Sequence, residues 1–243
     1  MKRTFVLGLL GVFLVGLITS PGLADKGKEV LEKMIEASGG RKLLSGIKDM
    51  TMSGTMEITM AGMSGSMTIY SKEPNKMRMD MEVMGMVIST AYDGETAWVT
   101  NPATGATEEL SGEAANQVVR QSLGNEALLL NPEKFGITYT YKGEEKIDDK
   151  DCVVLEVTYS DGHTATLYID AKTYLMYKVK QTSLTQMGVE ADSDVYLSDY
   201  KDVGGMKIAH TMKVFQDGQE AVTMTFTEVK FNTGIDDSLF KKD

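Results

Sequence analysis

Residues 50–86, MTMSGTMEITMAGMSGSMTIYSKEPNKMRMDMEVMGM, decide the fold because apolar and polar side chains alternate along them. Eleven of the chain's 18 methionines fall within these 37 residues. Between positions 48 and 60 the even positions carry mostly methionine, and the odd positions carry mostly threonine, serine and acidic residues. A period of two is that of a β-strand with one apolar and one polar face. The stretch therefore predicts consecutive strands whose methionines share a face.

The same alternation returns through most of the chain, with turn-forming residues between the segments. Two segments have helical spacing instead, 25–38 and 111–130. Because each strand is apolar on one face only, the sheet must curl around something, and the two helices are the natural filling. The predicted fold is mainly β (α+β): a strongly curved antiparallel sheet of about eleven strands, a half-barrel or open barrel with helices across its concave face. The later strands are expected at 135–142, 152–159, 164–170, 174–183, 190–200, 206–216 and 220–231.

The N-terminus has the layout of a secretory signal peptide. Lys2 and Arg3 precede an apolar run at 5–18, and a small residue, Ala24, ends the segment. We predict that residues 1–24 are cleaved before Asp25, leaving 25–243 as a single domain in the periplasm; an uncleaved N-terminal anchor is the alternative. The exported chain would carry 35 acidic and 23 basic residues. This acidic balance excludes nucleic acid as a favoured partner.

The methionines allow three interpretations. Thioethers bind Cu(I), but residues 50–86 contain no histidine, and the alternation places the methionines among isoleucines and valines. Plain core packing and an adaptable apolar cavity are the other two, and methionine suits the latter because it is flexible and polarisable. We predict that the cavity lining consists of Met50, Met52, Met56, Ile58, Met67, Ile69, Met77, Met79, Met81, Met86, Ile88, Trp98, Met206 and Ile208.

No catalytic or metal-binding constellation is evident. The chain has two histidines: His210 on an apolar strand face, expected in the core, and His163 in a turn. Cys152 is the single cysteine and lies in an apolar run, which favours a buried packing residue. Zinc-peptidase, serine-hydrolase and phosphate-loop motifs are missing from the sequence. The prediction is a protein that is not an enzyme and uses no cofactor or metal.

Three stretches carry a resemblance to a known family: AYDGETAWVTNPATG (91–105), GEEKIDDKDCVVLEVTYSDG (143–162) and the segment 167–212. With GGRKLLSGI (39–47) they resemble the outer-membrane lipoprotein-sorting superfamily, the Lol-type periplasmic carrier and its relatives. The resemblance implies a curved half-barrel whose apolar interior shelters acyl chains. A similar domain is also found appended to some zinc peptidases.

The sequence thus leads to a functional hypothesis: a monomeric periplasmic carrier or binding protein for lipids or lipoprotein acyl chains, acting in lipoprotein sorting. Such a carrier would contact a membrane-protein donor or acceptor transiently. The alternatives are a non-enzymatic envelope interaction domain with a filled core, and a methionine-rich copper-binding protein.

Overall fold

A computed structural model describes residues 21–185 and 188–242. Its helices are α1 (Pro21–Ser38), α2 (Arg41–Gly46) and α3 (Gly112–Ser122), with a π-helical turn at Glu126–Leu130 and 3₁₀ turns at Thr59–Ala61, Pro132–Phe135 and Asp237–Phe240. Its strands are β1 (Asp49–Ile58), β2 (Met63–Lys72), β3 (Lys76–Val83), β4 (Met86–Tyr92), β5 (Ala97–Thr100), β6 (Thr107–Glu109), β7 (Thr138–Ile147), β8 (Lys150–Thr158), β9 (Thr164–Asp170), β10 (Met176–Leu184), β11 (Glu190–Val203), β12 (Met206–Gln216) and β13 (Gln219–Phe231).

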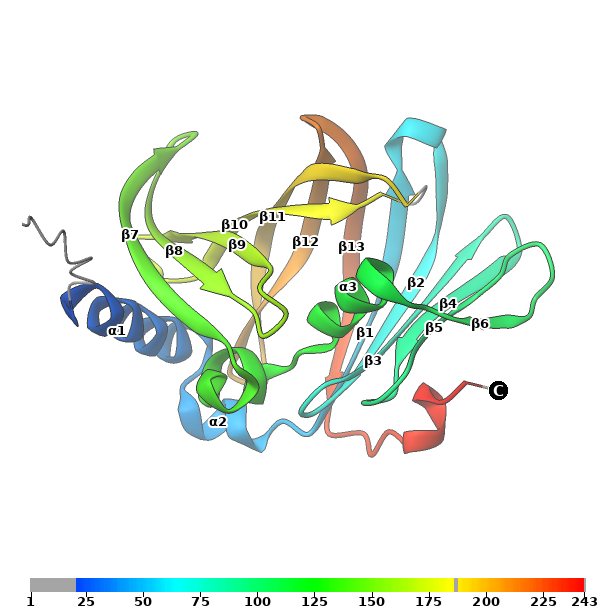
Figure 1. Cartoon of the computed structure of the whole chain (residues 1–243), viewed down its shortest axis with the longest axis horizontal. Coiled ribbons are helices and arrows are strands. Elements are labelled where there is room, and N and C mark those ends of the chain that lie inside the picture. Colours follow the sequence, from blue (N-terminus) through cyan, green and yellow to red (C-terminus); the bar gives the residue numbers. More distant parts are fainter. Residues whose placement is uncertain (1–20, 186–187, 243) are drawn as a thin grey trace, which may run out of the picture.

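These thirteen strands form one antiparallel sheet that curves without closing (Figure 1). The order is β6-β5-β4-β3-β2-β1-β13-β12-β11-β10-β9-β8-β7, so the first strand pairs with the last and the edges are β6 and β7. The predicted curved, open, mainly β fold is therefore confirmed. The sequence prediction missed two short strands, β5 and β6, because their three or four residues give too little alternation to recognise.

One half of the concave face is filled by helices, and we call it the covered half. Here α1, α2 and the π-helical turn pack against the inner side chains of β8 and β9. Ile35 of α1, Leu44 of α2 and Leu155 and Ile169 of the sheet are almost fully inaccessible to solvent. The helix predicted at 25–38 is confirmed, and its apolar residues Val30, Leu31, Met34 and Ile35 are all buried in this cluster.

The predicted signal peptide falls largely outside the described residues, which begin at Pro21. Helix α1 starts there, four residues before the predicted cleavage site at Asp25. Among the described helices, none has the length and apolar character needed to cross a membrane.

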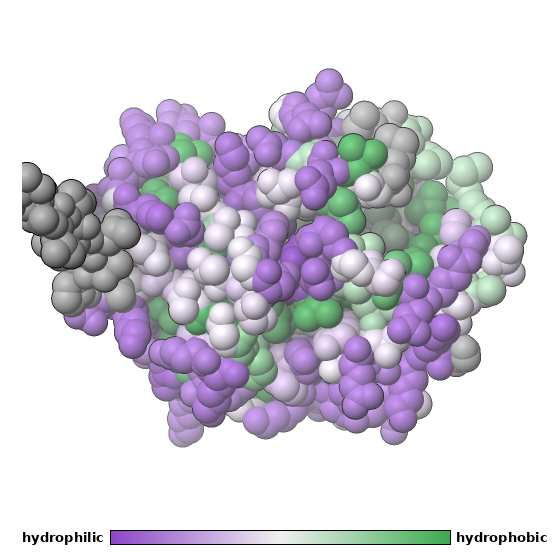
Figure 2. Space-filling view, viewed as in Figure 1, coloured by the Kyte–Doolittle hydropathy of each residue, from purple (hydrophilic) through white to green (hydrophobic). Residues whose placement is uncertain are grey.

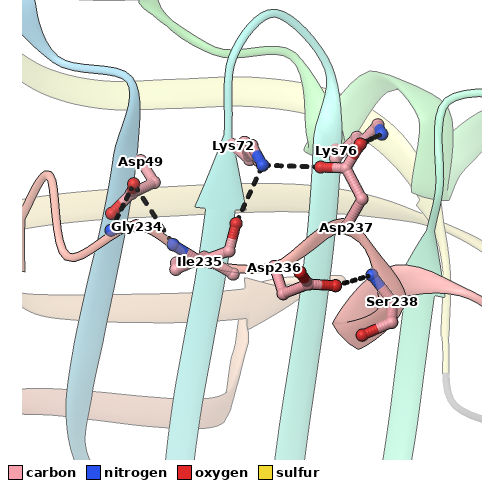
Figure 3. Close-up of polar contacts among 8 residues, drawn as sticks. All are labelled: Asp49, Lys72, Lys76, Gly234, Ile235, Asp236, Asp237 and Ser238. Carbon is pink, nitrogen blue, oxygen red and sulfur yellow. Dashed lines mark hydrogen bonds and ion pairs between the residues drawn. The ribbon is translucent and has the colours of Figure 1, made fainter.

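The C-terminal segment lies across the convex side of β1–β5, and Figure 3 shows its polar contacts. Asp49 accepts hydrogen bonds from the backbone N–H groups of Thr233 (2.7 Å) and Gly234 (3.0 Å). Lys72 and Lys76 both pair with Asp237, at 2.6 and 2.8 Å. The segment is therefore fastened to three neighbouring strands.

The end of this segment covers apolar surface as well. Phe240 is fully buried, and its carbonyl oxygen accepts a hydrogen bond from the indole nitrogen of Trp98 at 2.8 Å. Arg78 donates to the carbonyl of Leu239 at 3.0 Å and pairs with Asp80 at 2.7 Å. The alternation along 50–86 predicts that Arg78 and Asp80 face solvent; this is wrong, because the tail lies over them.

Candidate ligand-binding face

The second half of the concave face is lined by methionine, and we call it the methionine half. It comprises the inner side chains of β1–β4, β12 and β13. Strand register places Met67 opposite Met81 and Ile69 opposite Met79. On the other side, Met56 lies opposite Met224, which in turn lies opposite Met212. Because directly opposed residues in an antiparallel pair share a face, the methionines form a continuous band across the strands.

A glycine in the middle of β1 allows this band to pack. Gly54 occupies the inner position between Met52 and Met56, and it pairs with Phe226 of β13. A side chain at this position would meet the carbonyl oxygen of Thr225 at 2.0 Å, so only glycine fits. Phe226 is 1% exposed at the centre of the methionine cluster.

The methionine half is only partly covered. Met52, Met56, Met67, Val83 and Phe226 are buried, whereas the apolar side chains packed against them keep part of their surface accessible. These partly exposed members are Met50, Ile58, Met63, Ile69, Met79, Met81, Ile208, Met212, Val222, Met224 and Val229. Figure 2 shows apolar surface around a hollow on this side of the molecule. In the covered half, by contrast, helices occupy the corresponding space.

Helix α3 crosses the concave side and reaches both halves of the sheet. Val118 packs against Met77 and Ala97, with Ala115 beside them. At the other side, Gln117 accepts a hydrogen bond from the backbone N–H of Leu184 in β10 at 2.7 Å. The helix therefore covers the methionine half around Met77 and Ala97, and Figure 1 shows it lying across the concave side of the sheet.

An arginine fastens α3 to the opposite wall. Arg120 pairs with Glu113 on its own helix and with Asp161 in the turn between β8 and β9. Hydrogen bonding to Arg120 lowers the pKa of Glu113. Burial alone would raise the pKa of Asp161, but the N–H of His163 and the guanidinium of Arg120 lower it. Both carboxylates are thus held ionised, and the helix is held in place.

A carboxylate at the base of the helix sits in a less favourable environment. Glu73 accepts hydrogen bonds from the N–H groups of Asn125 (2.7 Å) and Glu126 (3.1 Å), which follow α3. Burial raises the pKa of Glu73 despite these two bonds. Glu73 also borders a hollow of about 230 Å³ that Met50, Leu123 and Leu128 line from the apolar side.

A second, larger hollow of about 430 Å³ is polar. It lies between α3 and the ends of β9–β11, where Glu113, Asn116, Asp161, His163 and Glu190 contribute to its walls. Helix α3 therefore has a polar hollow along one side and the methionine half along another.

Among the residues described, no three His, Cys, Asp or Glu side chains lie close enough together to hold a metal ion. Cys152 is buried, and burial raises the pKa of its thiol, which disfavours the reactive thiolate. His210 is 5% exposed and lies on the sheet with a ring nitrogen 3.0 Å from the carbonyl oxygen of Ile208, as expected for a core histidine.

The comparisons with known proteins identify the family and the fold. Residues 67–243 match a family model that carries the description "Uncharacterized protein". The chain belongs to this family. No curated protein matches the sequence. Three solved structures, however, share the architecture over 89–90% of this chain and 97% of their own.

These three structures share 15–17% sequence identity with this chain. They are a DUF1329 family protein from Desulfovibrio piger ATCC 29098 (17%, TM-score 0.62), a LolA superfamily protein from Nitrosomonas europaea (15%, 0.60) and an outer membrane lipoprotein-sorting protein domain from Vibrio parahaemolyticus (15%, 0.57). This chain therefore shares the fold of these structures, a LolA superfamily protein among them, as the resemblance in the sequence implied.

Within this fold, most of the predicted lining residues lie together. Met50, Met52, Met56, Ile58, Met67, Ile69, Met79 and Met81 belong to the methionine cluster, and Met77 lies beside it under α3. Ile208 touches both halves, whereas Met206 is buried in the covered half. Ile88 is half-buried opposite Met81. Met86 is 50% exposed at the rim.

Two predictions about the lining are wrong. Trp98 pairs with Ala91, which pairs with Arg78, so the indole lies on the convex face under the C-terminal segment. Helix 25–38 was expected to cover the methionines, but α1 packs in the covered half. Sequence reasoning also left Met212, Met224 and Phe226 out of the lining, although the alternation in 206–216 and 220–231 places them on the apolar face.

Proposed function

We propose that this protein is a non-enzymatic carrier that binds the acyl chains of a lipid or lipoprotein on its methionine half, in the periplasm. The observation that supports this most is the partial exposure of a band of flexible apolar side chains on the concave side of the sheet. Soluble proteins rarely leave a contiguous apolar area uncovered unless it binds something. The shared fold with lipoprotein-sorting proteins agrees with the proposal.

The binding energy would come from buried area. Each methylene removed from water contributes about 0.8 kcal/mol, so an acyl chain that buries about ten methylenes would gain about 8 kcal/mol before the costs of ordering. Methionine side chains change rotamer easily and can follow acyl chains of different length. Neither a metal nor a polar reaction centre is needed for this function.

The test is a titration of the delipidated protein with a fluorescent fatty-acid probe. Met81→Asp should weaken binding at least about tenfold, because it places a carboxylate within the apolar band. Glu82→Gln is the matched control, since Glu82 is the next residue on the same strand and faces the other side of the sheet. A wild-type protein that never binds the probe after delipidation contradicts the proposal.

Copper binding is the second candidate, favoured by the directly opposed methionine pairs Met67–Met81 and Met56–Met224. Thioether sulfurs from opposed strands could together hold Cu(I). A competition titration decides between the two functions. Tight stoichiometric Cu(I) binding that is lost in Met67→Leu with Met81→Leu would favour copper, whereas affinity no better than that of free thioethers would favour the carrier.

A further inference from the structure

Exposed apolar side chains concentrate at one rim of the sheet. In the described part of the chain, five large hydrophobic residues are exposed, and four of them lie at two hairpin turns. Met84 (80% exposed), Met86 (50%) and Val87 (53%) are at the β3–β4 turn, and Val189 (60%) is at the β10–β11 turn. The fifth, Leu23, is on α1. Isolated exposed hydrophobics need no explanation, but four on two hairpin tips do.

The two turns lie at the same rim because of the strand order. Six antiparallel pairings separate β3 from β10 in the sheet, so the two strands run in the same direction and end at the same side. The turns after β1 and β12 also lie at this rim for the same reason. Met84 and Gly85 both have positive φ (54° and 78°), which makes a tight two-residue turn that projects the Met84 side chain beyond the strands.

The rim is continuous with the methionine half. Met86 lies opposite Val83, and Ile88 lies opposite Met81. Val83 is buried in the methionine cluster, and Met81 packs against it. An apolar chain that entered over the β3–β4 turn would therefore contact apolar side chains from the tip to the cluster, without crossing a polar zone.

The charge around the tips restricts what can dock there. The segments 56–66, 81–91, 184–192 and 216–222, which contain the four turns, carry no lysine or arginine. They carry exposed acidic residues instead, among them Glu57, Glu82, Glu190 and Asp217. An anionic membrane or an acidic protein would be repelled. A bilayer surface without net charge accepts apolar tips and does not repel the acids.

We propose that this rim, formed by Met84, Met86, Val87 and Val189, docks on the surface of a zwitterionic phospholipid bilayer and opens the methionine half toward it. This inference rests on the proposed carrier function, because docking would let an acyl chain pass between bilayer and protein without crossing water. The docking itself is a property of the rim and is measurable whether or not a ligand binds inside.

The test is flotation of the full chain with phosphatidylcholine vesicles. The wild-type protein should float with the vesicles, and the variant carrying Met84→Ser, Val87→Ser and Val189→Ser should bind them at least about fivefold more weakly. Val203→Ser is the matched control, since it changes a partly exposed valine at the end of β11, at the opposite rim of the sheet, and it should float like the wild type. Adding phosphatidylglycerol to the vesicles should reduce binding at low salt, and higher salt should restore it.

A parallel titration with a soluble fatty-acid probe separates the two proposals. The rim variant should keep its probe affinity within about twofold of the wild type, because the substituted side chains lie outside the cluster. A wild type that does not float, or a rim variant that floats equally well, overturns the docking proposal. A basic protein surface would then be the partner that fits the apolar tips and the acidic residues around them. Absence of probe binding with normal flotation would instead overturn the carrier function alone.

Discussion

The covered half and the methionine half are parts of the same sheet face, yet they are built differently. In the covered half, leucine, isoleucine and valine from β8 and β9 interlock with α1 and α2. In the methionine half, β1–β4 and β13 present methionine, and α3 covers only one part. Branched side chains have few rotamers and pack into one arrangement, whereas methionine adapts to different neighbours. The difference is one of packing: the covered half is filled by helices, and the methionine half keeps apolar side chains partly exposed, as the proposed carrier function requires.

The largest difference is expected on truncation to alanine. Leu155→Ala, at a position without solvent exposure, should destabilise the protein by about 2–5 kcal/mol. The truncation leaves a cavity, and the helices and strands around it cannot move in to fill it. Met81→Ala, at a partly exposed position of the methionine half, should cost less than half as much. Denaturant unfolding followed by circular dichroism measures the free energy of unfolding of both variants. Equal losses would show that the two halves are packed alike.

The convex side beneath the methionine half provides the next test. Arg78→Asp places a carboxylate beside Asp80 and removes the donor to the carbonyl of Leu239, so we expect a loss of about 2–4 kcal/mol. Lys201→Asp, at an exposed position, should change the free energy of unfolding by no more than about 0.5 kcal/mol. If the two substitutions cost the same, the C-terminal segment does not stabilise this part of the sheet.

Acidification should release the C-terminal segment. Hydrogen bonds from Lys72 and Lys76 lower the pKa of Asp237 to about 2. Burial alone would raise the pKa of Asp49, but the N–H groups of Thr233 and Gly234 lower it. Both pKa values lie below the ordinary 3.8, so this stabilisation is complete above about pH 4 and is lost as the pH falls through the folded-state values.

Trp98 is the chain's single tryptophan and reports on this release directly. Its indole donates to Phe240, so its emission should shift to the red between about pH 4 and pH 2. Asp237→Asn should remove part of the pH dependence. Emission that stays constant over this range, with Asp237→Asn unchanged from wild type, would show that these carboxylates do not hold the segment.

The smallest effect is expected from a conservative change in the lining. Met79→Leu should keep the fold and cost less than about 1.5 kcal/mol, since the volume is nearly conserved. It should nevertheless change the affinity for a fatty-acid probe a few-fold, because leucine adapts less well to a guest. Val179→Leu, on the inner face of β10 beside the covered half, is the control and should leave probe affinity unchanged. Equal effects on probe affinity would contradict a ligand site confined to the methionine half.

The sequence was sufficient to predict which residues line the inner face of the methionine half. It was insufficient to predict which segments cover each surface of the sheet. Alternation in 50–86 placed Met52, Met56 and Met67 on one face, because the period of a strand fixes side-chain direction locally. The position of α1 and of the C-terminal segment depends on contacts between residues far apart in the chain, such as Trp98 with Phe240. Periodicity carries no information on such contacts, so Trp98 was assigned to the wrong face.

The proposed carrier function requires that an acyl chain binds the methionine half and not the covered half. Its most direct test is photolabelling of the delipidated protein with a fatty acid that carries a diazirine on its chain, followed by peptide mapping. We expect the label on the inner residues of β1–β4 and β13, such as Met79, Met81 and Met224. Label on α1 or β8, or a wild-type protein that takes up no label, would contradict the account.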